Sequence, residues 1–266
     1  MVSNYPLKQK KTMKKYIFMA VAGMLALSSC SNDDNDQTTQ NAPRQMTFTA
    51  GFGDGATTRA TLSDNSVSFD AHDRISILSA NNTNTEFFTT AGGAPATFTG
   101  TATADSKFYA VYPYTYGLTL SGTTISGVMI PTDQSYAASS PCGWDPTAPI
   151  AYATTTGTSL QFHNACALLK INNDRGDATE IQVSCNENLT GIFSLDTSDG
   201  ILSGGTYPFA SAGSVPNKTK IYIAIAPGTK TEFYTLWEGG GYAQKYKSSV
   251  TFEAGKIYDL GNTSEW

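Results

Sequence analysis

The chain has 266 residues, with 17 basic and 22 acidic side chains and a net charge of −5 at pH 7. Five lysines and no acidic residue lie before Cys30, so the chain from Cys30 onward has 12 basic and 22 acidic residues, a net charge of −10. This balance excludes the basic surface that nucleic-acid binding requires, and we expect no nucleic-acid partner.

Residues 1–29 predict a removable export signal. Lys14 and Lys15 precede an apolar run, residues 16–27, that is too short to cross a bilayer. Leu27-Ser28-Ser29-Cys30 then matches a lipobox, and the segment resembles the signal of bacterial lipoproteins that carry lipid on the cysteine. We therefore expect Cys30 to be the lipidated N-terminus, attached to the membrane through its acyl chains, palmitate among them.

Residues 30–44 predict a disordered acidic tether. Ser31 to Asp36 is an acidic cluster that resembles the surface-export signal of Bacteroidetes lipoproteins, which implies the outer face of the outer membrane. The cluster is also explained as a solvated linker, because Asn, Asp, Gln and Thr bury little apolar area. Both interpretations are compatible.

From residue 45 the pattern is that of an all-β protein, because apolar and polar residues alternate between Gly, Asn, Asp and Pro turns. In the first predicted strand Met46, Phe48, Ala50 and Phe52 share one face, and threonines occupy the other. The remaining strands of the first half are expected at 67–69, 75–77, 108–112 and 128–130.

A proline-rich loop, residues 135–149, leads us to expect an N-terminal domain over residues 45–155 and a C-terminal domain over 156–266. Strands of the second half are expected at 160–171, 180–185, 191–195, 220–226, 232–237, 242–247 and 256–260.

The order of several short motifs resembles the Bacteroidetes fimbrillin-like family, the subunits of type V pili. The matching residues are Phe48-x-Ala50, Thr58-Arg59-Ala60-Thr61, Phe69 with Asp73, Ile75 and Ile77, Tyr109 to Tyr114, Ile130-Pro131-x-x-Gln134, Leu160-x-Phe162-His163, Ala167-Leu168-Leu169, Ala226-Pro227-Gly228, and Phe252-x-Ala254-Gly255-Lys256-x-Tyr258. Relatives often carry Trp where Phe69 stands, and both side chains fill a core-facing aromatic position.

This resemblance implies two tandem transthyretin-like, Greek-key β-sandwich domains with no catalytic activity or cofactor. It also implies that a surface protease cuts between Arg59 and Ala60, removing the lipid together with the first strand. The groove left by Met46, Phe48, Ala50 and Phe52 would then receive a strand from another pilus subunit. The other interpretation of Arg59 is an ordinary exposed loop arginine.

The residues after Leu260 favour a tip or accessory subunit over a shaft subunit. Gly261 to Trp266 is mostly polar, whereas polymerising relatives have a C-terminal segment able to act as donor strand. The alternative is a monomeric surface glycan-binding lipoprotein that keeps its lipid. Besides other pilus subunits, a host or bacterial surface glycan or protein is a candidate partner. A structural spacer without a ligand is a third hypothesis.

The pattern does not favour an enzyme or a metal site. His72 and His163 lack nucleophile or carboxylate neighbours at catalytic spacing, and a three-residue separation within a strand would place His163 and Cys166 on opposite faces. Asp196 and Asp199-Gly200 predict a turn rather than a calcium loop.

Cys166 and Cys185 are expected to be separate, buried thiols. We expect strands 160–171 and 180–185 to form a hairpin in which Leu169, Ile171 and Cys185 face the core while Cys166 faces away, so no disulfide can form. The sequence does not define the state of Cys142.

Aromatic residues mark two possible ligand contacts. Trp237 and Tyr242, with Phe233 and Tyr246, are expected to face each other across a hairpin, an arrangement that stabilises hairpins without a ligand. Trp144 lies in the proline-rich loop, where it would contact a sugar or protein or would fix the loop to the core.

Overall fold

The computed structural model describes residues 42–53, 68–135, 145, 147–175, 178–213, 215, 219–239 and 242–266, with the backbone alone at Gly239, Tyr242 and Ala243. This part of the chain is built from β-strands and one short 3-10 helix, η1 (Thr263–Glu265), so the all-β prediction is confirmed. Within it, no helix has the length and apolar character needed to cross a membrane.

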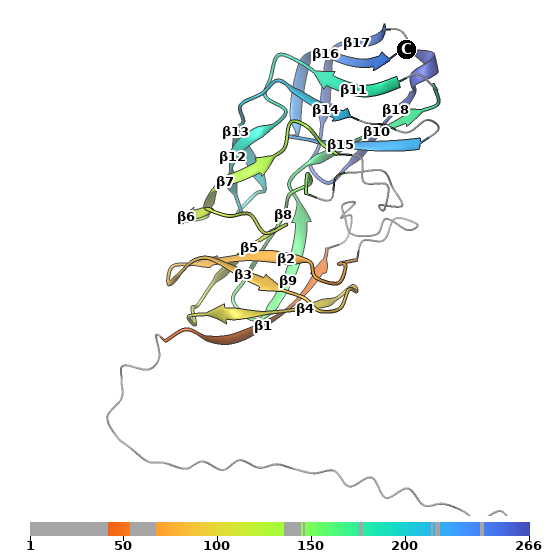
Figure 1. Cartoon of the computed structure of the whole chain (residues 1–266). Helices are drawn as coiled ribbons and strands as arrows, with labels where there is room; N and C mark the ends of the chain where they lie inside the picture. Colours follow the sequence, from red (N-terminus) through yellow and green to blue (C-terminus); the bar gives the residue numbers. More distant parts are fainter. Residues whose placement is uncertain are drawn as a thin grey trace, which may run out of the picture. The chain divides into compact units, whose positions relative to one another are not determined.

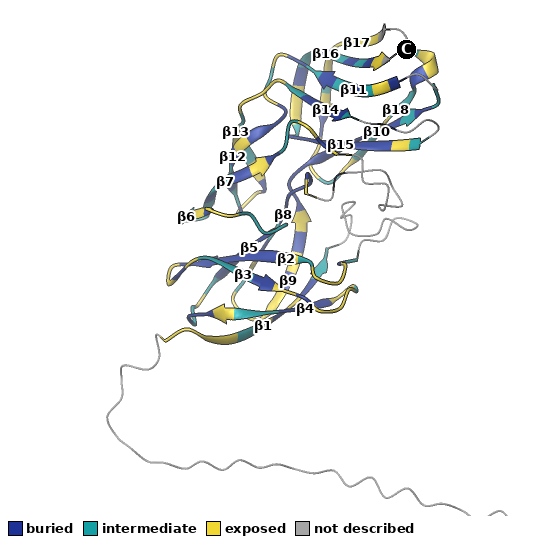
Figure 2. Cartoon of the chain, viewed as in Figure 1, coloured by how far each residue is buried: buried dark blue, intermediate teal, exposed yellow. Residues whose placement is uncertain are grey.

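Seven strands form a closed barrel (Figure 1). In hydrogen-bonded order they are β1 (Arg44–Phe52), β4 (Ala96–Ala102), β3 (Asn82–Phe88), β2 (Arg74–Ser79), β5 (Phe108–Tyr112), β8 (Ala151–Thr155) and β9 (Ser159–Asn164). Aromatic, aliphatic and alanine side chains fill its interior, because every second residue of each strand points inward. The central strands β2 and β5 are buried along almost their whole length (Figure 2).

Two further sheets face each other across a second core. One contains β15 (Thr219–Ile225), β10 (Ala167–Asn173) and β18 (Ile257–Asn262). The other contains β14 (Phe209–Gly213), β11 (Ala178–Ser184), β16 (Gly228–Gly239) and β17 (Tyr242–Phe252), which lie side by side in Figure 1. Alternate residues of both sheets, including Ile171, Ile223, Val183 and Trp237, are buried between them, as expected for a β-sandwich.

A fourth sheet contains β13 (Ile201–Gly204), β12 (Gly191–Asp196), β7 (Thr124–Ile130) and β6 (Thr119–Ser121). Its inner side chains, such as Val128 and Phe193, share one core with Val111 of the barrel and Leu168 of β10. Strand pairings cross the expected boundary at residue 155: β7 pairs with β12 of the later half, and β9 of the later half pairs with β1 and β8.

The expected hairpin between strands 160–171 and 180–185 is wrong. The first segment is divided at Ala165 and Cys166 into β9 and β10, and β10 pairs with β15 and β18. Strand β11 belongs to the facing sheet, between β14 and β16. Leu169, Ile171 and Cys185 nevertheless share one core because the two sheets face each other, and Cys166 lies in another core, as predicted.

Candidate functional site: the first strand and its groove

Strand β1 closes the barrel by hydrogen bonding on both sides. It runs antiparallel to β4, from Arg44 opposite Ala102 to Ala50 opposite Ala96. Its second half runs parallel to β9, where Thr49 to Phe52 pair with Ser159 to Phe162. The backbone N–H of Gly53 extends this ladder by donating to the carbonyl of Phe162 at 3.0 Å. Without β1, both β4 and β9 would become open edges.

The core-facing side chains of β1 are those that the alternation predicts. Phe48 and Ala50 are fully buried, and Met46 and Phe52 are half-buried against the same core. The Phe48 ring meets Phe87 and Phe108 edge-on, at centroid distances of 5.3 and 5.2 Å. Phe48 therefore occupies a large aromatic pocket, and Ala50 occupies a small one.

Phe52 fills the other end of the groove. Its ring stacks on Phe69 with a centroid distance of 4.7 Å and lies 5.9 Å from the Phe162 ring of β9. Phe69 is held by two backbone hydrogen bonds with Gly93, at 2.9 and 3.0 Å, and not by a full strand. The end of β1 thus depends on contacts with a segment, residues 68–70, that follows it in sequence.

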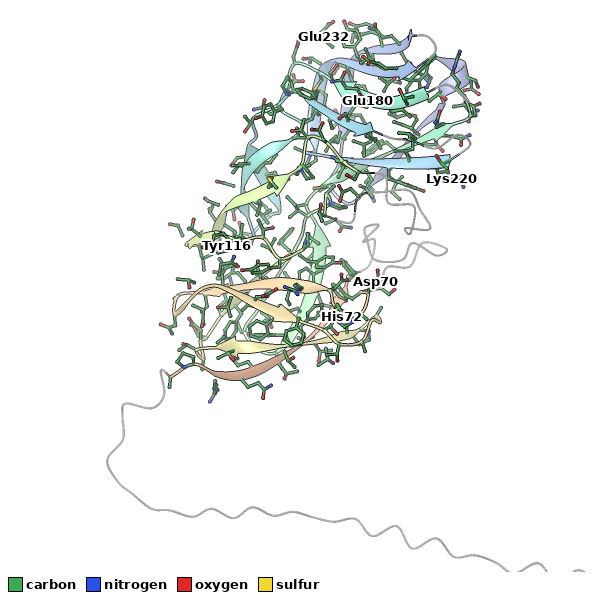
Figure 3. All side chains as sticks on the ribbon, viewed as in Figure 1. Asp70, His72, Tyr116, Glu180, Lys220 and Glu232 are labelled. Atoms are coloured by element: carbon green, nitrogen blue, oxygen red, sulfur yellow. The ribbon has the colours of Figure 1, made fainter. Side chains whose placement is uncertain are left out.

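A polar contact fixes the wall behind this aromatic cluster. The buried hydroxyl of Tyr112 donates a 2.7 Å hydrogen bond to Oδ2 of Asp73, and the N–H of Asp70 donates to the same oxygen at 2.9 Å. Tyr112 belongs to β5 and Asp73 precedes β2, so the bond from Tyr112 joins β5 to the turn before β2. Both residues fall within motifs of the sequence resemblance, and their contact explains why these types occur together. Asp70 and His72 are labelled beside this turn in Figure 3.

Close packing also requires glycine in β4. A Cβ atom on Gly100 would lie 2.7 Å from the Phe87 ring and 2.8 Å from the carbonyl oxygen of Glu86. The Phe87 ring packs against Gly100 and also contacts the Phe48 ring. The width of the groove at Phe48 therefore depends on the missing side chain at Gly100.

The chemistry that this groove offers is strand recognition. Its walls supply main-chain donors and acceptors along β4 and β9, and its floor supplies a large and a small apolar pocket. A segment that replaced β1 in the same direction would run antiparallel to β4 and parallel to β9. The alternation in the sequence indicated the buried face, but gave no signal of the parallel pairing with β9, which lies more than 100 residues away.

Several predicted site residues lie outside the described residues: Cys30, Arg59, Ala60 and Trp144, as does Cys142. Of Tyr242 the structure describes the backbone, which pairs with Glu238. Trp237 is 1% exposed and lies in the second core, with the guanidinium of Arg175 4.2 Å from its ring centroid. It therefore presents no open ring face to a ligand.

The hairpin of β16 and β17 has the predicted partners in a register shifted by one residue. Trp237 pairs with Ala243, and Phe233 pairs with Lys247. The aromatic pair across the hairpin is Tyr234 with Tyr246, whose ring centroids are 5.0 Å apart. Because side chains alternate along a strand, this shift sends Phe233 and Trp237 into the core and the two tyrosines outward.

The histidine and cysteine positions do not converge. His163 is exposed on β9 beside Tyr152, whereas Cys166 is fully buried. Cys166 and Cys185 are free, separate thiols, as predicted. Burial raises the pKa of Cys166 to about 12 and also raises the pKa of Cys185. Among the described residues, no three His, Cys, Asp or Glu side chains are grouped so as to hold a metal ion.

The predicted turn at Asp196 to Gly200 is confirmed. The carboxylate of Asp196 accepts hydrogen bonds from the N–H and hydroxyl of Ser198, at 2.9 and 2.7 Å. Gly200 has a φ of 78°, in the left-handed region that favours glycine. These hydrogen bonds keep the pKa of Asp196 below its ordinary value.

No protein-family model and no curated protein matches the sequence. Two solved structures share the fold, each named a "putative cell adhesion protein". The one from Bacteroides uniformis ATCC 8492 has a TM-score of 0.53 and 15% identity, and the one from Bacteroides ovatus ATCC 8483 has a TM-score of 0.52 and 13% identity. Each match covers 83% of this chain and 93% of the other. The predicted resemblance is therefore confirmed at the level of the fold, which this chain shares with these two Bacteroides proteins.

Proposed function

We propose that this protein is a surface-exported, fimbrillin-like lipoprotein that serves as a tip or accessory subunit of an adhesive type V pilus. The observation that carries the proposal is the position of β1, which closes the barrel and is the first strand of the described chain. One cut at Arg59 would detach this strand from the rest of the protein and leave every other strand intact. The tandem transthyretin-like organisation expected of the family is part of the same proposal.

The cut would release lipid and strand together. Residues 30–59 contain both Cys30 and β1, so processing would free the protein from the membrane and open its groove at once. The released strand would leave behind backbone groups of β4 and β9 and the apolar pockets of Phe48 and Ala50. Such a groove favours capture of a strand from another pilus subunit.

The geometry of β1 defines what that donor strand must contain. It needs a large apolar residue for the pocket between Phe87 and Phe108, and a small one two positions later for the pocket of Ala50. Half-buried apolar residues would flank them, at the places of Met46 and Phe52.

The contacts of residues 263–266 disfavour their use as a donor strand. The hydroxyl of Ser264 donates to the carboxylate of Asp174, and the N–H of Ser264 and the hydroxyl of Thr263 donate to it at 2.8 and 3.0 Å; these bonds keep the pKa of Asp174 below its ordinary value. Trp266 packs against the second core. We propose that η1 stays on its own domain, leaving a neighbour's groove to another segment.

N-terminal sequencing of protein sheared from the cell surface tests this function. We expect Ala60 as the first residue, and we expect the Arg59→Gln variant to stay in the outer-membrane fraction with its lipid. Arg44→Gln is the matched control, because Arg44 is exposed at the start of β1 and a cut there would leave the strand in place. A lipidated Cys30 in wild-type surface protein would instead support the monomeric binding lipoprotein.

A further inference from the structure

Aromatic side chains form a row on the outer face of the β14-β11-β16-β17 sheet. The strand register places Phe209 beside Ser184, Ser184 beside Tyr234, and Tyr234 beside Tyr246. The opposite faces of these strands supply Ala210, Val183 and Phe233 to the second core. The row therefore points away from the core.

The row ends in a ring pair on each side. Tyr234 and Tyr246 lie 5.0 Å apart between centroids, and Phe209 lies 5.9 Å from Tyr207, two positions earlier. Tyr246 is 47% exposed and Tyr207 is 46% exposed, at opposite ends. Phe209 and Tyr234 are separated by two strand spacings, about 10 Å, with the Ser184 hydroxyl group between them.

A carboxylate is held beside one ring pair. Glu232 accepts hydrogen bonds from the hydroxyl of Tyr246 at 2.9 Å and from that of Tyr234 at 3.4 Å. Its φ of 51° is left-handed, which is uncommon for a residue with a side chain, and it interrupts the pairing of β16 with β17. Figure 3 labels Glu232 and Glu180 on this sheet.

Apart from Leu236, the rest of this face is polar, and none of its described side chains is basic. The same register places Gln182 and Gln244 on either side of Leu236, and Glu180 beside Glu238. Lys245 and Lys247 pair with Thr235 and Phe233, so their side chains leave the opposite side of β17. Apart from Leu236, the described side chains that border the row are therefore amides and carboxylates.

We propose that the outer face of this sheet is a binding site for a neutral oligosaccharide, with Tyr207, Phe209, Tyr234 and Tyr246 as stacking rings and Glu232 as hydrogen-bond acceptor. Pyranose rings present C–H groups to aromatic faces and hydroxyl groups at their edges. A row of ring, hydroxyl and ring, two strand spacings long, offers two sugar units these complementary contacts. A carboxylate accepts hydrogen bonds from sugar hydroxyls, and the absence of basic side chains among the described residues of this face disfavours acidic sugars.

A protein partner fits this surface less well. The buried centre of a protein interface is depleted of charged residues, whereas here Glu232 lies within the row and Glu180 and Glu238 border it. Tyrosine has few rotatable bonds, so its ring loses little conformational entropy on contact with a ligand. The site is separate from the β1 groove, and the proposal does not depend on pilus assembly.

The test is binding of the full chain to four hexasaccharides, measured by titration calorimetry. The neutral probes are cellohexaose, xylohexaose and maltohexaose, and the acidic probe is hexagalacturonic acid. We expect saturable binding of at least one neutral probe and none of the acidic one. Tyr246→Ala and Tyr234→Ala should each weaken binding of the neutral probe about tenfold, because each variant loses one aromatic contact. Met129→Ala and Ile192→Ala are matched controls, since both side chains are exposed on another sheet, and binding should be unchanged.

Thermal unfolding of each variant separates loss of a contact from loss of the fold. Should the alanine variants unfold, Glu232→Gln and Tyr246→Phe carry the test, because they keep the rings and change only polar contacts. We expect each to weaken binding at least threefold. Three results would overturn the proposal: no neutral hexasaccharide binds, the acidic one alone binds, or a folded Tyr234→Ala/Tyr246→Ala double variant binds as wild type.

Discussion

The side-chain amide of Gln134 forms two hydrogen bonds with the backbone of Ala224. Its Nε2 donates to the carbonyl oxygen at 2.7 Å, and its Oε1 accepts from the N–H at 2.8 Å. Gln134 is 2% exposed, and its own N–H donates to the carbonyl of Ser211 in the facing sheet. One side chain therefore pairs with the edge of β15 as a strand would. It connects the segment after β7 to both sheets of the β-sandwich.

Replacing Gln134 with Met should lower the free energy of unfolding by about 2–4 kcal/mol. Met has a similar volume, so the loss reports two buried backbone groups deprived of their partners. Urea denaturation measures it. Gln161→Met on the exposed face of β9 is the matched control and should change stability by less than about 0.5 kcal/mol. Equal effects of the two substitutions would contradict this role of Gln134.

Gly100→Ala should destabilise the barrel by about 1–3 kcal/mol, because the new methyl group would meet the Phe87 ring and a backbone carbonyl at less than contact distance. Gly51→Ala is the control within the same groove, where the nearest atom to a Cβ, Nε2 of Gln161, is 3.9 Å away. Thermal unfolding of both variants tests the difference. Near-wild-type stability of Gly100→Ala would show that the Phe87 ring can shift without loss.

The alternation of inward and outward residues predicts β1, β2 and β5 of the barrel, whereas β3, β4 and β8 are not expected from the sequence. The alternation of Thr47, Phe48, Thr49 and Ala50 predicts the correct buried and exposed faces of β1. The pairing partner of each strand does not follow from the sequence, since the same alternation is compatible with many neighbouring strands. No polar residue marks the break between β9 and β10 at Ala165 and Cys166, because both residues are apolar and fully buried.

The register of the β16–β17 hairpin shows a second limit. A turn signal near Gly239 to Gly241 indicates a hairpin, but one residue more or less in the turn moves every side chain to the other face. The structure resolves this in favour of Trp237 inside and Tyr234 outside. The aromatic row of the proposed sugar site depends on this register and on strands far apart in sequence, so sequence reasoning missed it.

Cys166 should make stability fall with pH in the alkaline range. Burial raises the pKa of its thiol from 9.0 to about 12, so the folded state holds the proton more tightly than the unfolded state. The stabilisation is complete below pH 9 and is lost as the pH rises from about 9 towards 12, with a slope of about 1.4 kcal/mol per pH unit. Comparing urea denaturation of wild type and Cys166→Ala at several pH values isolates the contribution of Cys166, because both proteins contain the same tyrosines. A constant difference across this range would contradict the assignment.

Strand β1 should act as an exchangeable ligand of the barrel, with Phe48 as its main anchor. In the intact chain, Phe48→Ala should cost about 3–5 kcal/mol of stability, because the Phe48 ring is fully buried between Phe87 and Phe108. Thr49→Ala, on the exposed face of the same strand, should cost less than about 0.5 kcal/mol.

After cleavage at Arg59 and removal of the released segment, the protein should unfold at a lower temperature. A synthetic peptide of residues 44–53 should restore the midpoint, the Thr49→Ala peptide should do the same, and the Phe48→Ala peptide should fail. Restoration by the Phe48→Ala peptide would mean that backbone pairing alone fills the groove, and a donor strand would then need no large residue at that position.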